Sequence, residues 1–366
     1  MIRQTCRSTV SRRARQGSVA GSPAGACHAR ILSVIAACPA IVGWLGLMVA
    51  AAGCDGTLDA GRNEQQGMLP VDQHNPIIIA NDNFADNWAG EFAVLLANSG
   101  GPTLVGIVVD ASNYWPDLNA NLTGWTNFVT AARASGLKHI PDVTPGASTP
   151  LTVPADQKIG STVPLQTAGA QLILDLSRQL YLPGQPLVVV TGAQLTDLAD
   201  AYLMDSTVVD RVVVVASLGL YSAPRATMTG PNGDLDPWAD WIVAQRFHYI
   251  QVTVRYDQTG DITADDFANL PKKQFGEWIV AKQPNLRTLD TATDQVSILA
   301  AAVPSFVTTA ARCAPDISAG FNSPPGQGPP LVPNATGNAS MVTQVDGPLV
   351  RKRLWEMLQA PHIFGS

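Results

Sequence analysis

An apolar run that opens into acids and amides constrains the fold of this sequence more than any other feature. The run is Pro76-Ile77-Ile78-Ile79-Ala80, and it leads directly into Asn81-Asp82-Asn83-Phe84-Ala85-Asp86-Asn87. A short apolar run bounded by turn formers is typical of a buried parallel strand, and the apolar residues that follow it have helical spacing. We therefore expect the polar side chains at the carboxyl end of a strand, where open α/β sheets bind their ligands.

These polar side chains have two interpretations. A cluster of hard oxygen donors at the edge of a sheet favours a divalent cation, most naturally calcium. Asp and Asn are also common turn and helix-capping residues, because their side chains hydrogen-bond to nearby backbone N–H groups. This stretch alone does not decide between them.

Length and composition predict a globular protein. The chain has 366 residues, of which 46% are hydrophobic and 14% are charged, which is enough for one large domain or two ordinary ones. The formal charge of -6 and the pI of about 5.3 argue against a nucleic-acid partner, because phosphate binding needs a basic face.

The N-terminal segment resembles an export signal. Residues 1–30 contain six Arg and no Asp, Glu or Lys, and residues 31–52 carry no charge. The segment ends Ala51-Ala52-Gly53-Cys54, which resembles the lipobox of bacterial lipoproteins. A single transmembrane anchor is the alternative. We expect residues 1–54 to be a signal peptide with a lipobox-like end, Cys54 to be lipidated, and the folded part to lie in the bacterial cell envelope.

The residues after the signal predict a tether and then a domain without disulfides. Residues 55–75 are polar and are expected to link the membrane to a domain formed by residues 76–366. After loss of the signal and modification of Cys54, only Cys313 remains as a thiol. The domain is then held together by its core.

From Pro76 onward, strand-like and helix-like segments alternate. Expected strands lie at residues 103–109, 138–143, 186–191, 211–217 and 249–254. Expected helices lie at residues 85–98, 125–135, 168–181, 195–204, 238–245 and 263–270. Uniformly apolar runs such as Val212-Val213-Val214-Val215 indicate strands buried on both faces. The prediction is an α/β protein with a mostly parallel, Rossmann-like open sheet flanked by helices, and with long loops at residues 220–236 and 313–338.

The first motif resembles the signature of the inosine/uridine-preferring nucleoside hydrolase family. That signature is an apolar strand followed by D-T-D-P-G-x-D-D-A, and here the equivalent is Ala80-Asn81-Asp82-Asn83-Phe84-Ala85-Asp86-Asn87-Trp88. Its second and third aspartates are present as Asp82 and Asp86. Its first aspartate is Ala80 here and its fourth is Asn87.

Further segments resemble the same family in the same order over residues 76–358. They are Gly106-Ile107-Val108-Val109-Asp110-Ala111-Ser112-Asn113, Ile140-Pro141-Asp142-Val143-Thr144-Pro145-Gly146-Ala147, Gly192-Ala193-Gln194-Leu195-Thr196-Asp197-Leu198-Ala199, Asn232-Gly233-Asp234-Leu235-Asp236-Pro237-Trp238-Ala239 and Thr293-Asp294-Gln295-Val296-Ser297-Ile298-Leu299-Ala300. Because chance matches would not keep their order, the resemblance implies the nucleoside hydrolase fold.

The resemblance also implies a calcium site and a reaction. The expected metal ligands are Asp82, Asn87, the carbonyl of Thr196 and Asp294, with Asp82 also acting as the general base on a water molecule. The expected ribose-binding residues are Asp86, Asn113 and Asn232. The expected activity is calcium-dependent hydrolysis of the N-glycosidic bond of ribonucleosides, with an oxocarbenium-like transition state.

Some family positions differ here. Asn87 removes a negative charge from the expected ion, and Ala80 removes an acid that supports the site in the family. Gly230 replaces the ribose-binding Glu, and Thr293 replaces the His that assists the leaving base. Another residue would have to assist departure of the base, and the candidates are the aromatic residues Tyr221, Trp238 and Tyr256. Alternatively, these three side chains are part of the hydrophobic core.

Two alternatives to nucleoside hydrolysis follow from these differences. One is a hydrolase of a related glycoside with the same fold. The other is a nucleoside- or sugar-binding lipoprotein with little or no turnover. In every case the expected partners are a small-molecule nucleoside or related glycoside, the membrane through the N-terminal lipid or signal anchor, and a second copy of the chain in a homo-oligomer, with no nucleic acid.

Overall fold

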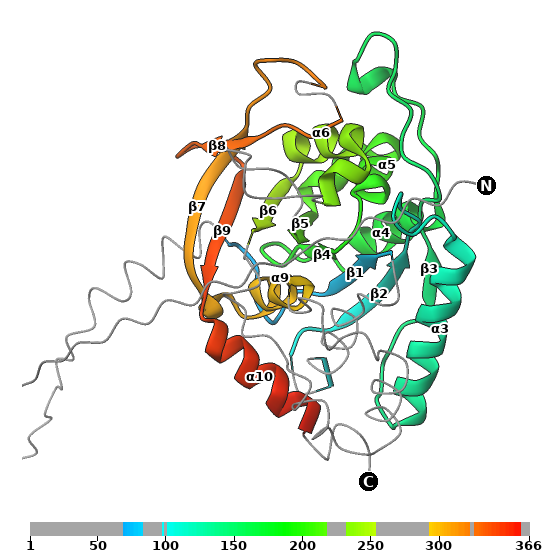
Figure 1. The fold of residues 1–366 in the computed structure, drawn as a ribbon, viewed down its shortest axis with the longest axis vertical. Helices are drawn as coiled ribbons and strands as arrows, with labels where there is room; N and C mark the ends of the chain where they lie inside the picture. Colours follow the sequence, from blue (N-terminus) through cyan, green and yellow to red (C-terminus); the bar gives the residue numbers. More distant parts are fainter. Residues whose placement is uncertain are drawn as a thin grey trace, which may run out of the picture. The chain divides into compact units, whose positions relative to one another are not determined.

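The computed structural model describes residues 69–82, 97–98, 101–217, 232–253, 293–322 and 326–359. These residues form a nine-stranded sheet in the order β3-β2-β1-β4-β5-β6-β9-β7-β8 (Figure 1). The strands are β1 (Ile77–Asn81), β2 (Leu104–Val109), β3 (Val143–Pro145), β4 (Leu187–Thr191), β5 (Val212–Ser217), β6 (His248–Val252), β7 (Val307–Pro315), β8 (Leu331–Pro333) and β9 (Ala339–Val345).

The sheet is parallel from β3 to β9. Strand β1 is the third strand in this order, with Ala80 opposite Val108 of β2 on one side and opposite Thr191 of β4 on the other. Strand β7 runs antiparallel to β9, and β8 runs antiparallel to β7. The strand order reverses between β1 and β4, which is the position where open α/β sheets form a ligand crevice. The predicted fold class is therefore confirmed.

Helices cover both faces of the sheet, because the central strands are apolar on both sides. The helices are α3 (Leu118–Ala134), α4 (Ala168–Gln179), α5 (Thr196–Met204), α6 (Pro237–Arg246), α9 (Thr293–Ala302) and α10 (Gly347–Gln359). One core packs side chains such as Ile79 and Val215 with α3 and α9. The other packs side chains such as Ile78 and Val214 with α4, α5 and α6. The side chains of successive residues in one strand thus pack into opposite cores.

Most predicted strands occur within one or two residues of their expected bounds, with two corrections. The strand expected at residues 138–143 begins only at Val143, because His139 has a φ of 56° and Pro141 lacks an N–H group. The loop expected at residues 313–338 contains the end of β7 and all of β8. Strand β7 was missed because its partly exposed Thr and Ala residues give no apolar run.

Helix α3 starts earlier than its apolar pattern predicts. The pattern begins at Trp125, whereas the helix begins at Leu118, where the Asp117 carboxylate accepts a hydrogen bond from the Ala120 N–H at 3.0 Å. In the first two turns the apolar residues Leu118, Ala120 and Leu122 alternate with polar ones, so helical periodicity could not reveal them. The helices expected at residues 85–98 and 263–270 lie outside the described residues, apart from residues 97–98, which are helical.

The packed region extends to the N-terminal side of Pro76. Leu69 and Val71 lie within the expected tether, yet they are buried in the core beside α3. The Asn75 amide also donates to the Pro186 carbonyl at 2.8 Å. The folded domain therefore includes Leu69, and the expected signal at residues 1–54 lies outside the described residues. Among the residues that the structure describes, no helix is long and apolar enough to span a membrane.

Candidate functional site

Buried acids gather at the carboxyl ends of β1, β2 and β4. Asp82 follows β1 and is 4% exposed, Asp110 follows β2, and Asp197 lies in the first turn of α5 after β4. Backbone hydrogen bonds hold these strand ends together: the Asp110 N–H donates to the Asn81 carbonyl and the Gly192 N–H to the Ala80 carbonyl, both at 2.9 Å. The site therefore stands at the position where the strand order reverses.

Asp110 and Asp197 form a buried carboxyl pair. The Ala147 N–H donates to both of them, at 2.9 Å to Asp110 Oδ1 and at 3.1 Å to Asp197 Oδ2, and the Thr167 hydroxyl also donates to Asp197. Burial, followed by the charge of Asp197 and a hydrogen bond to it, raises the pKa of Asp110 well above its usual range. Asp110 Oδ2 is buried and has no hydrogen-bond partner among the described residues. Asp110 therefore keeps its proton to a higher pH than a free aspartate does.

Two glycines make room for this carboxyl pair. A Cβ atom at Gly146 would overlap Asp110 Oδ1 and Asp197 Oδ2, and a Cβ at Gly169 would lie 2.8 Å from Asp197 Oδ1. Real Cβ atoms do not approach other heavy atoms this closely. Any side chain at Gly146 would displace the carboxyl groups.

Asp236 joins three segments at the same end of the sheet. Its Oδ2 accepts from the Thr196 hydroxyl and the Leu151 N–H, each at 2.8 Å, and its Oδ1 caps α6 by accepting from the Ala239 N–H at 3.0 Å. Burial raises the pKa of Asp236, and the hydrogen bonds that it accepts partly oppose this effect. Asp236 therefore fixes the start of α5, where Thr196 lies, against α6.

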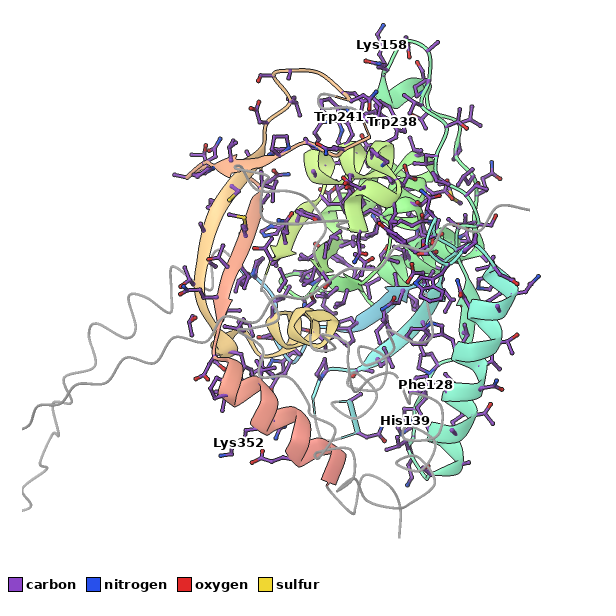
Figure 2. The ribbon with its side chains drawn as sticks, viewed as in Figure 1. Phe128, His139, Lys158, Trp238, Trp241 and Lys352 are labelled. Carbon is purple, nitrogen blue, oxygen red and sulfur yellow. The ribbon has the colours of Figure 1, made fainter. Side chains whose placement is uncertain are left out.

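The β3–α4 loop, residues 146–167, is held in place by hydrogen bonds at both ends. Ala147 and Leu151 bind buried carboxylates at its start, and near its end the N–H groups of Leu165 and Thr167 donate to Asp200 at 2.7 and 2.8 Å. The loop extends beyond the helices in Figure 1, and Figure 2 places Lys158 at its far end and Trp238 beside it. The Trp238 indole N–H donates to the Thr162 hydroxyl at 2.9 Å.

The structure brings together some of the predicted site residues. Asp82 and Thr196 are buried and follow the adjacent strands β1 and β4. Asn113 is exposed in the turn after β2, and Asn232 starts a short 3-10 helix (Asn232–Leu235), with its amide donating to the Ser217 carbonyl at 2.8 Å.

The other predicted site residues are not described. Asp86 and Asn87 lie outside the described residues, as do Tyr221, Gly230 and Tyr256. Asp294 lies in α9, but its side chain is not described, and the same holds for Thr293. Trp238 is a core residue whose ring packs against Phe321, with centroids 4.6 Å apart.

The donors that the structure describes suit a hard cation in their chemistry. Asp82 offers a carboxylate and Thr196 a backbone carbonyl, which are oxygen ligands of the kind that calcium prefers. Within the described ranges, no group of three or more His, Cys, Asp or Glu side chains could hold a metal ion. The other expected ligands, Asn87 and the side chain of Asp294, lie outside what the structure describes.

Several buried acids were given no role by sequence reasoning. Asp110, Asp197, Asp236 and Asp240 are all 2% exposed or less. Both carboxyl oxygens of Asp240 lack a hydrogen-bond partner among the described residues, and burial followed by the charges of Asp236 and Asp234 raises its pKa well above the usual range. The available signal was position: Asp110 directly follows an apolar strand, Asp236 caps α6, and Asp197 and Asp240 lie in the first turns of α5 and α6.

No protein-family model matches the sequence, and no curated protein matches it. Solved structures do match the fold. An inosine-guanosine nucleoside hydrolase is 16% identical with a TM-score of 0.59, and a plant nucleoside hydrolase is 17% identical with a TM-score of 0.56; each alignment covers 78% of this chain and at least 98% of the other. This chain has the nucleoside hydrolase fold.

A third solved structure also matches the fold of this chain. The purine-preferring ribonucleoside hydrolase from Gardnerella vaginalis is 17% identical with a TM-score of 0.55, and the alignment covers 79% of this chain and 99% of that one. The nucleoside hydrolase fold therefore accounts for most of the chain, as the order of the sequence motifs predicted.

Proposed function

We propose that this chain is a divergent nucleoside hydrolase that cleaves the N-glycosidic bond of ribonucleosides in a calcium-dependent reaction. The observation that carries the proposal is the position of Asp82. It is a buried carboxylate at the carboxyl end of strand β1, beside the position where the strand order reverses, in a chain with the nucleoside hydrolase fold. Thr196 follows the neighbouring strand β4, so the two residues lie at the same edge of the sheet.

The proposed calcium ligands are Asp82, Asn87, the carbonyl of Thr196 and Asp294. A calcium ion held by them would supply positive charge that orients the ribose diol and makes a nearby water molecule more acidic. The hydrogen bond from the Thr196 hydroxyl to Asp236 would keep the start of α5 in place for this role.

In the proposed reaction, Asp82 takes a proton from a water molecule. The water oxygen forms a bond to the anomeric carbon while the bond from that carbon to the base nitrogen breaks, and the electron pair leaves with the base. Positive charge develops on the ribose in the transition state, and the buried carboxylates at this edge stabilise it. Asp86, Asn113 and Asn232 are the proposed partners of the ribose hydroxyls.

The deciding experiment uses the full-length protein purified in detergent. Bound metal is measured by elemental analysis, and release of free base is measured for a panel of purine and pyrimidine nucleosides with and without added calcium. We expect about one calcium per chain and turnover that stops when a chelator removes it. Absence of both metal and turnover would contradict the proposal and would favour a binding lipoprotein or a hydrolase of another glycoside.

Asp82→Asn tests the general base directly. The amide keeps the size of the side chain but cannot accept the proton, so we expect kcat to fall by about 100-fold or more. Asp142→Asn is a matched control, because the Asp142 side chain is 89% exposed and pairs only with Arg133 among the described residues. A variant at position 82 that is as fast as the parent would refute the assignment.

We also propose that the protein acts in the bacterial cell envelope, anchored through a lipid on Cys54. The support is the basic and then apolar leader that ends in Ala51-Ala52-Gly53-Cys54. Mass spectrometry of the mature N-terminus tests this proposal, since a free or internal Cys54 would contradict it.

A further inference from the structure

Exposed apolar side chains are concentrated on two loops at the edge of the sheet that carries the site. Of the nine large apolar side chains that are exposed among the described residues, five lie on the loop after β2 or on the β3–α4 loop. They are Tyr114, Trp115, Val153, Val163 and Leu165. Clustered exposure of apolar surface is a feature of binding sites, whereas isolated exposed apolar residues are ordinary.

The two loops leave the sheet side by side. Val109 at the end of β2 pairs with Pro145 at the end of β3, and beyond them the Ala111 N–H donates to the Ala147 carbonyl at 2.8 Å. Figure 1 shows both segments leaving the same edge of the sheet near β1. The loop after β2 is therefore next to the buried acids, because the pair of Asp110 and Asp197 binds that same Ala147.

The aromatic residues stand on a rigid turn. Ser112 and Trp115 exchange two backbone hydrogen bonds, at 3.0 and 3.1 Å. The buried Asn121 of α3 then donates to the carbonyls of both Asp110 and Trp115, at 2.9 and 3.1 Å. The backbone is fixed from two sides, while the Tyr114 side chain is 66% exposed and that of Trp115 is 42% exposed.

Rigid, exposed aromatic rings suit one kind of ligand. A planar heteroaromatic ring gains stacking energy on such a surface, and little conformational entropy is lost because the turn is already ordered. The residue between Ser112 and Tyr114 in this turn is Asn113, the proposed partner of a ribose hydroxyl. A ring attached to that ribose would lie within reach of the two side chains that directly follow Asn113.

We infer that Tyr114 and Trp115 are specificity-determining residues that stack on the nucleobase of the substrate. The inference rests on the proposed function for the identity of the ligand. It assigns recognition of the leaving base to the loop after β2, and it favours nucleosides with large planar bases over those with small ones.

The test compares three forms of the full-length protein: the parent, the double variant Tyr114→Ala/Trp115→Ala, and the control Tyr181→Ala. Tyr181 is also an exposed aromatic residue, 43% exposed, but it follows α4 and lies toward the opposite edge of the sheet. Calorimetry measures binding of inosine, uridine and ribose, and turnover is measured separately. We expect the double variant to bind inosine at least about tenfold more weakly and ribose equally well, with the control unchanged.

The outcomes separate this inference from the proposed function. If the parent binds nucleosides without hydrolysing them and the double variant binds more weakly, the stacking role stands and the hydrolase proposal fails. If the parent hydrolyses nucleosides and the double variant has the same affinity and KM, the stacking role is overturned and the hydrolase proposal stands. A parent that binds no nucleoside overturns the stacking role. The stacking role is also overturned if the double variant binds nucleosides as the parent does and differs only in its sedimentation coefficient. The two aromatic rings would then form a contact between copies of the protein.

Discussion

Gly146 shows how a single missing side chain shapes the site. Its Cα lies against the carboxyl oxygens of Asp110 and Asp197, where a methyl group would overlap both. The same turn provides the Ala147 N–H that binds both acids. The glycine is thus required for close approach between backbone and side chains.

Gly146→Ala should therefore destabilise the protein by about 1–3 kcal/mol, the usual cost of overpacking a filled interior. Gly160→Ala is the matched control, since a Cβ at Gly160 meets no heavy atom within 4 Å. Urea unfolding of both variants measures the difference. Equal stability of the two variants would show that the carboxyl pair can move aside freely.

Asp240→Asn should change how stability depends on pH. Burial raises the pKa of Asp240 in the folded protein well above its usual range, so the folded chain holds this proton more tightly than the unfolded chain does. The parent therefore loses stability as the pH rises from about 4 toward the raised pKa, at up to about 1.4 kcal/mol per pH unit. The amide does not titrate, so the stability of the variant relative to the parent should increase as the pH rises.

Urea unfolding of the parent and the Asp240→Asn variant at several pH values between about 4 and 7 measures this difference in the free energy of unfolding. The fully buried carboxyl has no hydrogen-bond partner among the described residues that could offset the cost of its charge. A difference in stability that does not vary with pH would contradict the raised pKa.

At the scale of elements, helices and strands are joined by polar contacts at both edges of the sheet. Asp205 ends α5 and starts a short 3-10 helix (Ser206–Asp210), and it pairs with Arg178 of α4 and with Arg211 just before β5, at 2.9 and 3.2 Å. Hydrogen bonds from the Thr207 hydroxyl and then Arg178 lower the pKa of Asp205 far below its usual range.

Asp205→Asn should lower the melting temperature at neutral pH but not in acid. A carboxylate whose folded pKa is depressed contributes stability above its unfolded pKa of about 3.9 and loses that contribution as the pH falls toward the folded value. The difference between parent and variant should thus shrink steadily below about pH 4. Thermal unfolding followed by circular dichroism tests this, and a constant difference down to the lowest accessible pH would contradict it.

The elements predicted best from sequence are those whose pattern comes from burial on both faces. Strands β4 and β5 are buried along their whole length and were predicted to within one residue at each end. The start of α3 and all of β7 were missed, because their stability comes from the Asp117 cap and from pairing with β9 and not from an apolar pattern. Such contacts join residues that are not periodic in the sequence.

The site was only partly predictable for a similar reason. The sequence motifs predicted that Asp82 and Thr196 lie at the same edge of the sheet, where the structure places them, while their roles stay a prediction. The pairing of Asp110 with Asp197 was not predicted, because the two residues are far apart in the sequence and come together only in the folded chain, where both also bind Ala147. Their partnership depends on the tertiary structure.

At the scale of the whole molecule, the two cores share one sheet, so they should unfold together. Phe128→Ala in the core beside α3 and Leu174→Ala in the core beside α4 should each cost about 2–5 kcal/mol. Each should shift a single transition, with coincident midpoints by tryptophan fluorescence and far-ultraviolet circular dichroism. Two separate transitions in either variant would show that the faces are independent.

The ends of the sheet bear on how copies of this protein can associate. Its outermost strands, Val143–Pro145 and Leu331–Pro333, are three residues long, and each finishes in proline. Proline has no N–H group to offer a further strand, and so short an edge presents few free backbone groups. Strand-to-strand polymerisation is therefore discouraged at both margins, and any homo-oligomer would form through helices or loops and not by extending the sheet from one copy into the next.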